Sequence, residues 1–251
     1  MAGRDPGERF RSLKASGRLP HGIIGDCLYE RIGREVNKFV EKTRAYIPES
    51  PLEPLEINLN LSGFQLTGRI DGIYPESLIR YRYAAVLPKD RLDIWILHLA
   101  LNCVRQPAYP PGSMLFGLDA NNKKDNRWAA WEYLPVTNSE EILGDLLAKY
   151  WKGLLKPIHF FPASSWRFAQ SVAEKKMPVE QAEEIARSIW NGNDYIPGES
   201  RDPYYALCFE KSDPFDPEFR EFAVEIFHPL LKHQKRVDSF ESERRKAKKP
   251  V

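Results

Sequence analysis

Two neighbouring stretches decide the fold of this chain: Gly68-Arg69-Ile70-Asp71-Gly72 and, after one short bend, Leu78-Ile79-Arg80-Tyr81-Arg82. Asp71 ends the first stretch, which has the pattern of a β-strand. Arg80 and Arg82 are two residues apart in the second, so they share one face of the strand that it forms. We therefore expect one carboxylate and two guanidinium groups to meet where these strands adjoin.

A metal-dependent nuclease built on two such strands needs a particular set of side chains. An aspartate on the first strand and an acid, a spacer and a lysine on the second let two carboxylates hold Mg²⁺ while the lysine steadies the attacking water. Here only Asp71 remains, because Arg80 and Arg82 occupy the acid and lysine positions. Arginine stays protonated, accepts no hydrogen bond and repels a divalent cation. We predict a degenerate site with no catalytic residue, no metal and no cofactor.

Asp71 is open to two interpretations. It is either a relict Mg²⁺ ligand or the partner of Arg80 or Arg82 in an ion pair. The ion pair is favoured, since one carboxylate beside two guanidinium groups is a poor Mg²⁺ site. Arg80 and Arg82 could in turn bind a DNA phosphate or serve only as structural ion pairs.

The two stretches resemble the nuclease-like domain at the C-terminal end of the gamma (RecC) subunit of exodeoxyribonuclease V. The resemblance continues over residues 63–72, Arg80-Tyr81-Arg82, residues 88–92 and 95–101, and Asp202-Pro203-Tyr204-Tyr205. It implies an α/β (α+β) fold of the PD-(D/E)xK restriction-endonuclease-like type, a central mixed sheet flanked by helices, without catalysis. It also implies a role in double-strand-break repair, with the beta and alpha subunits of a RecBCD-type complex as partners and DNA bound through that complex.

Further positions depart from the active relatives in the way that this resemblance implies. Those nucleases carry a Gln-x-x-x-Tyr pair on the helix after the lysine strand and a histidine on the first helix. This chain has Asp93 and Leu97 at the first pair of positions and Tyr29 at the other. Two alternatives remain open: an active Mg²⁺ nuclease with rearranged ligands, for which Glu76 is the nearest second carboxylate in sequence, and an adaptor domain kept for protein contacts only.

The charge is unevenly distributed along the 251 residues. The net charge is +2, yet residues 232–251 carry eight Lys or Arg against three Asp or Glu, which leaves −3 for the rest. A body of that charge is not one that wraps duplex DNA by electrostatics alone. Local DNA-binding candidates are Lys123, Lys124 and Arg127, in a polar loop beside aromatic residues that form either a stacking platform or part of the core, Trp128, Trp131 and Tyr133.

Composition and cysteine spacing bound the domain organisation. Apolar residues make up 42% of the chain, enough for the core of one domain. Its three cysteines lack metal-ligand spacing, and no apolar stretch is long enough for a bilayer, so we expect reduced thiols, a cytoplasmic location and no membrane contact. We expect a polar lead-in at 1–24, a nuclease-like domain with C-terminal helical additions at 25–235, and a basic, disordered tail at 236–251, in a chain excised from a longer subunit.

Periodicity predicts the main elements. A helical period over residues 32–43 precedes a period of two over 55–61 and 64–70, which indicates a β-hairpin, and residues 78–83 are expected as its third strand. Further expectations are a buried helix over 92–104 with His98 as a core histidine, a hairpin of 114–118 with 128–136, a helix after a capping box at Thr137–Glu140, a helix over 178–190, an ordered aromatic loop around Tyr204 and Tyr205, and a last helix from Asp216.

Overall fold

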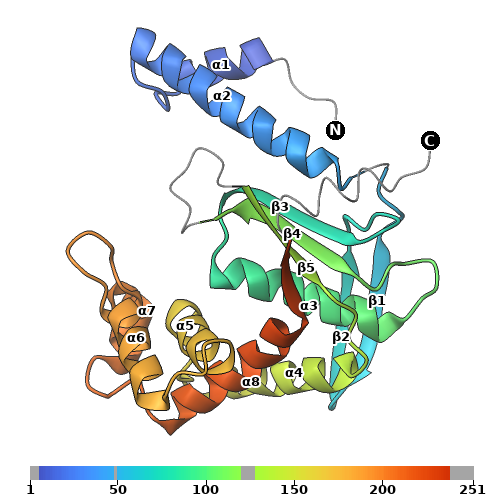
Figure 1. The fold of residues 1–251 in the computed structure, drawn as a ribbon, viewed down its shortest axis with the longest axis vertical. Helices are drawn as coiled ribbons and strands as arrows, with labels where there is room; N and C mark the ends of the chain where they lie inside the picture. The colour runs from blue at the N-terminus through green and yellow to red at the C-terminus, as the bar shows by residue number, and fades with distance from the viewer. Residues whose placement is uncertain (1–5, 48–49, 120–127, 238–251) are drawn as a thin grey trace. The chain divides into compact units, whose positions relative to one another are not determined.

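A computed structural model describes residues 6–47, 50–119 and 128–237. The chain divides into two compact units, Met1–Pro48 and Glu49–Val251 (Figure 1). The DNA-binding candidates Lys123, Lys124 and Arg127 lie outside the described residues, as do positions 238–251 of the expected tail. Arg236 and Val237, the first two residues of that tail, belong to a β-strand.

The first unit consists of helix α1 (Pro6–Ala15) and helix α2 (Ile23–Arg44). Lys14 donates to the Asp26 carboxylate at 2.7 Å, and the rings of Phe10 and Tyr29 lie 4.8 Å apart, so charge and aromatic packing join the two helices. α2 agrees with the helical period read from the sequence. α1 lies within the stretch 1–24, where a polar lead-in is expected.

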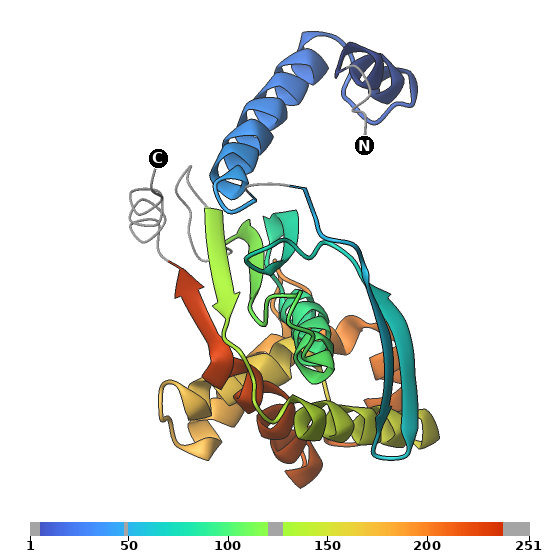
Figure 2. The same ribbon diagram turned by 90° about the vertical axis from the view of Figure 1, so that its right-hand side faces the viewer.

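The central sheet of the second unit contains strands β3 (Leu78–Ala85), β4 (Ser113–Leu118), β5 (Trp128–Tyr133) and β6 (Gln234–Val237), in that spatial order. β3 and β4 are parallel, whereas the other neighbours are antiparallel. Helix α3 (Pro88–Val104) makes the crossover that a parallel pair requires. The sheet is therefore mixed, and helices flank it, as the sequence predicts (Figures 1 and 2).

The hairpin of β1 (Leu55–Leu61) and β2 (Phe64–Ile70) forms a separate two-stranded sheet, with Leu55 opposite Ile70. The prediction that residues 78–83 form its third strand is wrong. Gly72 has φ +65°, which turns the chain out of β2, and only one bridge, Ile73 to Leu78, joins the two sides of the bend. β3 instead pairs along β4.

Five α-helices lie between β5 and β6 in the chain: α4 (Ser139–Leu155), α5 (Pro162–Ala173), α6 (Val179–Asn191), α7 (Pro203–Phe209) and α8 (Pro217–His233). α4, α6 and α8 were predicted, and Asp216 caps α8 by accepting from the Phe219 amide at 3.0 Å. The prediction of a capping box at Thr137 is wrong, because the residue that precedes α4 is Asn138, and its side chain makes no cap bond. The expected aromatic loop at Tyr204 is helix α7, capped by Asp202.

Two hydrophobic clusters hold this unit together. The larger joins the hairpin, the sheet and helices α3, α4 and α8 through side chains such as Ile70, Trp95 and Phe227. The smaller is mainly aromatic and includes Phe161, just before α5, and Phe219, in α8. Among the helices of the described residues, none has both the length and the apolar composition needed to cross a bilayer.

Candidate functional site

The ion pair expected for Asp71 forms with Arg80. The Arg80 Nη2 lies 2.9 Å from the Asp71 Oδ1, and its Nη1 donates to the backbone oxygens of Asp71 at 2.8 Å and Ile79 at 3.1 Å. A Cβ on Gly72 would lie 2.6 Å from this Nη1, so the guanidinium occupies the space that the missing side chain leaves. Arg80 thus ties the bend after β2 to β3.

Arg82 pairs with a different carboxylate, Asp90, in the first turn of α3. The second oxygen of Asp90 accepts from the Leu87 amide at 2.8 Å, which satisfies one of the donors that a helix start leaves open. Partial burial raises the pKa of Asp93, and the nearby Asp90 carboxylate raises it further. Sequence reasoning missed Asp90, whose position three residues after Leu87 is the usual one for a carboxylate that caps a helix start.

Arg80 and Arg82 are therefore held by separate acids. Asp71 is exposed and, among the described residues, forms its ion pair with Arg80 alone, and Glu76 lies exposed in the bend. Among the described residues, no group of three or more His, Cys, Asp or Glu side chains is placed to hold a metal ion. As a chemical unit, the arrangement is a cationic strand with carboxylate partners.

His98 is a core histidine, as expected. Its Nε2 lies 3.0 Å from the carbonyl oxygen of Leu134, which can only accept, so Nε2 carries the proton. Nδ1 then accepts from the Ser113 hydroxyl at 2.7 Å. Burial lowers the pKa of His98 to about 4, so the ring is neutral at pH 7 and both nitrogens are satisfied.

The aromatic residues near the expected basic loop belong mainly to the core. Trp131 and Tyr133 are buried, and Trp128 is half-buried with its ring 6.0 Å from that of Phe116. Burial raises the pKa of the Tyr133 hydroxyl. Of the two interpretations of these aromatics, the structure supports core packing.

A polar cavity of about 320 Å³ lies between the N-terminal end of α3, helix α5 and strands β4 to β6. Arg91, which is only 9% exposed, lines it, and its guanidinium carbon lies over two indoles: 4.2 Å from the ring centre of Trp131 and 4.9 Å from that of Trp166. Sequence reasoning missed this cavity, since its residues come from distant segments.

Comparison with known proteins adds a family to this geometry. A family model described as the RecC C-terminal domain matches residues 1–173, more than half of the chain. The chain belongs to the RecC C-terminal domain family. The match takes in Asp71, Arg80 and Arg82, together with Arg91 and Trp166 of the cavity.

Individual relatives are distant but match along most of this RecC C-terminal domain chain. The RecBCD enzyme subunit RecC of Buchnera aphidicola subsp. Schizaphis graminum is 23% identical over 238 residues, 91% of the chain and 21% of the relative. The RecC subunit of Escherichia coli K12 is 24% identical over 231 residues, which are 88% of the chain and 19% of the relative. The RecC subunit of Mycobacterium tuberculosis H37Rv is 21% identical over 217 residues, which are 86% of the chain and 19% of the relative. The chain spans about a fifth of the length of these curated relatives.

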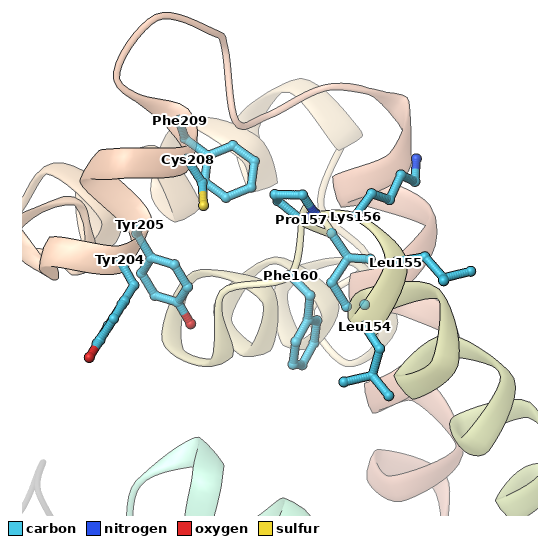
Figure 3. A pocket seen from close by; sticks show the side chains of 11 residues that line it. Leu154, Leu155, Lys156, Pro157, Phe160, Tyr204, Tyr205, Cys208 and Phe209 are labelled. Atoms are coloured by element: carbon cyan, nitrogen blue, oxygen red, sulfur yellow. The ribbon is translucent and has the colours of Figure 1, made fainter.

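A second, apolar pocket of about 420 Å³ lies in this RecC-family chain between the C-terminal end of α4 and helix α7. Figure 3 shows Leu154, Leu155 and Phe160 across from Tyr204 and Tyr205. Three of these side chains are largely exposed: Leu154 by 59%, Leu155 by 72% and Tyr204 by 78%. Large apolar side chains exposed together around a pocket are typical of a protein-contact surface.

Proposed function

We propose that this domain retains the frame of a PD-(D/E)xK nuclease without its chemistry. It acts as a non-catalytic part of a cytoplasmic RecBCD-type helicase–nuclease in double-strand-break repair, where it organises contacts with the beta and alpha subunits and guides separated DNA strands. The element order α2, β1, β2, β3, α3, β4 supports the frame, since it is the core order of those nucleases.

The observation that carries the loss of catalysis is the pairing of the two arginines. Arg80 and Arg82 stand where the acid and the lysine of a working site would stand, and each binds a carboxylate. Arg80 also binds the backbone oxygen of Asp71 in the bend, and the Asp90 carboxylate that pairs with Arg82 accepts from the Leu87 amide at the start of α3. Asp71 gives a metal one carboxylate beside a guanidinium 2.9 Å away, which Mg²⁺ does not favour. Removing either arginine would disturb a bend or a helix start before it created a metal site.

A nuclease assay tests this proposal. The purified chain with Mg²⁺ or Mn²⁺ should cleave neither single- nor double-stranded DNA. Arg80→Asp with Arg82→Lys should gain weak metal binding at most, because Tyr29, Asp93 and Leu97 also depart from the active pattern. Metal-dependent cleavage that Asp71→Ala abolishes would show instead an active nuclease with rearranged ligands.

The apolar pocket supports a second candidate, an adaptor that contacts protein only. Leu155 and Tyr204 offer exposed apolar surface on either side of it, and contact with a partner subunit would remove that surface from water. The variant Leu155→Asp/Tyr204→Asp should weaken assembly with the beta and alpha subunits when all are co-expressed, whereas Tyr195→Asp, at an exposed site outside the pocket, should not. If the assembled complex binds fork DNA equally well with and without this domain, the adaptor is the better description.

A further inference from the structure

The guanidinium of Arg91 is buried with few partners. It offers five N–H donors. Its Nη1 donates to the Gln234 Oε1 at 2.6 Å, and the Tyr133 hydroxyl is also within hydrogen-bonding reach. Among the described residues, no carboxylate lies within ion-pair distance of Arg91. Glu174 and Asp119 act on Arg91 electrostatically from beyond that distance. A buried charge without a direct ion pair is costly, so this side chain favours an anion beside it.

Arg167 lines the same cavity and also has an unused donor. Its Nε is buried and has no hydrogen-bond acceptor among the described residues. Its Nη1 lies 3.5 Å from the Gln170 Oε1, the outer limit for a hydrogen bond. Two guanidinium groups from different helices, α3 and α5, therefore line one cavity with donors to spare.

The remaining charges of the cavity leave it cationic. Arg236 is paired with Asp119 at 2.6 Å. Glu174, at the end of α5, is exposed and forms no ion pair with a described residue. Arg91 and Arg167 thus face a single unpaired carboxylate, and one negative charge from a ligand would complete the balance.

The indoles decide how a ligand can approach Arg91. The guanidinium carbon of Arg91 lies over both rings, 4.2 Å from the centre of Trp131 and 4.9 Å from that of Trp166, so the indoles pack on the flat part of the group and the N–H donors along its edge serve for contact with a ligand. A guanidinium edge presents two parallel N–H groups, the geometry that binds two oxygens of one oxyanion.

We propose that this cavity is an oxyanion site that binds a phosphate group, with Arg91 and Arg167 as the donors. Phosphate rather than carboxylate rests on the proposed function, since separated DNA strands present phosphodiesters that carry one negative charge each. The two indoles pack against the Arg91 guanidinium, and the Gln234 Oε1 accepts from its Nη1.

The test uses the whole chain, with tryptophan fluorescence and calorimetry as readouts, because Trp131 and Trp166 flank the site. The probes are inorganic phosphate, a single-stranded oligothymidine and acetate, each at constant ionic strength. Phosphate and the oligonucleotide should both bind with a change in indole emission, and acetate should bind more weakly. Trp166→Phe should reduce that change.

Arg167→Gln is the decisive variant, because the Arg167 Nε has no partner to lose and the fold should be kept. It should weaken phosphate binding about tenfold, the loss expected for one charge-assisted hydrogen bond. Arg91→Met should abolish binding, with folding checked by circular dichroism. Lys175→Gln removes the same charge from an exposed position just beyond the cavity lining and should leave binding unchanged.

The outcomes separate this site from the proposed function. No phosphate response in the native chain, or an equal response in Arg167→Gln, overturns the site. An indole emission change on adding the oligonucleotide that Arg167→Gln leaves unchanged overturns the site while the DNA-guiding function stands. Phosphate binding with no oligonucleotide binding supports the site and argues against that function. Acetate binding without phosphate binding identifies a protein carboxylate as the ligand and contradicts the phosphate assignment.

Discussion

Gly72 is the residue on which the bend between the two sheets depends. Its φ of +65° strains any other residue, and a Cβ there would meet the Arg80 Nη1 at 2.6 Å. Gly63, in the hairpin turn, has φ +84° but nothing within 4 Å of a Cβ. A side chain at Gly63 would meet backbone strain only, whereas a side chain at Gly72 would meet backbone strain and a steric clash.

We expect Gly72→Ala to destabilise the protein more than Gly63→Ala. Both substitutions carry the cost of a left-handed residue, about 1 kcal/mol. Only Gly72→Ala also displaces the Arg80 guanidinium from Asp71. Urea unfolding of the two variants gives the comparison. Equal losses of unfolding free energy would mean that the Arg80 contact contributes nothing to stability.

His98 predicts how stability depends on pH. Its pKa is lowered by burial to about 4, whereas an unfolded histidine titrates near 6.5. The unfolded chain therefore takes up a proton first as the pH falls. Between pH 6.5 and 4.5 the free energy of unfolding should decrease, by up to about 1.4 kcal/mol per pH unit. Above pH 6.5 this contribution is complete and constant.

The measurement is urea unfolding across that pH range, with His98→Gln as the comparison. Glutamine does not titrate, so the free energy of unfolding of the variant should depend less on pH. The variant should also be less stable at pH 7, because the ring that bonds both Ser113 and Leu134 is lost. An unchanged slope in His98→Gln would assign the acid sensitivity to other groups.

At the scale of elements, local patterns predicted those whose signals are contiguous. The hairpin has the expected limits at 55–61 and 64–70, because alternation and a Ser-Gly turn lie within one short stretch. The Asp216-Pro217 start of α8 is local in the same way. α7 carries the same signal at Asp202-Pro203, so the sequence could have revealed it.

Non-local pairing explains what the sequence did not predict. β6 has four residues, most of them polar, and becomes a strand only because β5 offers it a partner. The partition of β1 to β3 into two sheets depends on β4 in the same way. In the sequence Arg91 is one more charged residue near a helix start. Only the fold brings Trp131, Trp166 and Gln234 into contact with it.

Helix caps give a prediction at this scale. Asp216→Ala should lower the free energy of unfolding by about 1 kcal/mol, because its carboxylate accepts from the Phe219 amide at the start of α8. Asn138→Ala is the control, since Asn138 holds the same position before α4 without a side-chain cap bond. Thermal denaturation of both variants should separate them. A comparable loss in Asn138→Ala would contradict this account of the two caps.

At the scale of the whole molecule, the uneven charge predicts where DNA affinity resides. Residues 232–251 are strongly basic and the rest carries −3, so deleting residues 240–251 should remove most of the binding to fork DNA. Each phosphate neutralised by Lys or Arg adds about −0.9 to the slope of log K against log salt. The deletion should therefore flatten the salt dependence as well.

Fluorescence anisotropy over a salt series measures both effects. Arg80→Ala/Arg82→Ala is the comparison, and it should change binding less than the deletion does, since both arginines already have carboxylate partners. If the double variant loses most of the affinity and the deletion none, Arg80 and Arg82 form a phosphate site.

The position of β6 sets when the cavity can form during synthesis of the chain. Arg91 and its acceptor Gln234 are 143 residues apart. A ribosome adding roughly 5–20 residues per second needs on the order of ten seconds to cover that distance. Once β5 has been added at Tyr133, α3, β4 and β5 can assemble, but until residue 234 is added the Arg91 guanidinium has no Gln234 to bind and the edge of β5 has no strand beside it. A nascent chain stalled before β6 therefore presents an open strand edge and an unsatisfied cation together, features by which chaperones could distinguish it from the finished protein.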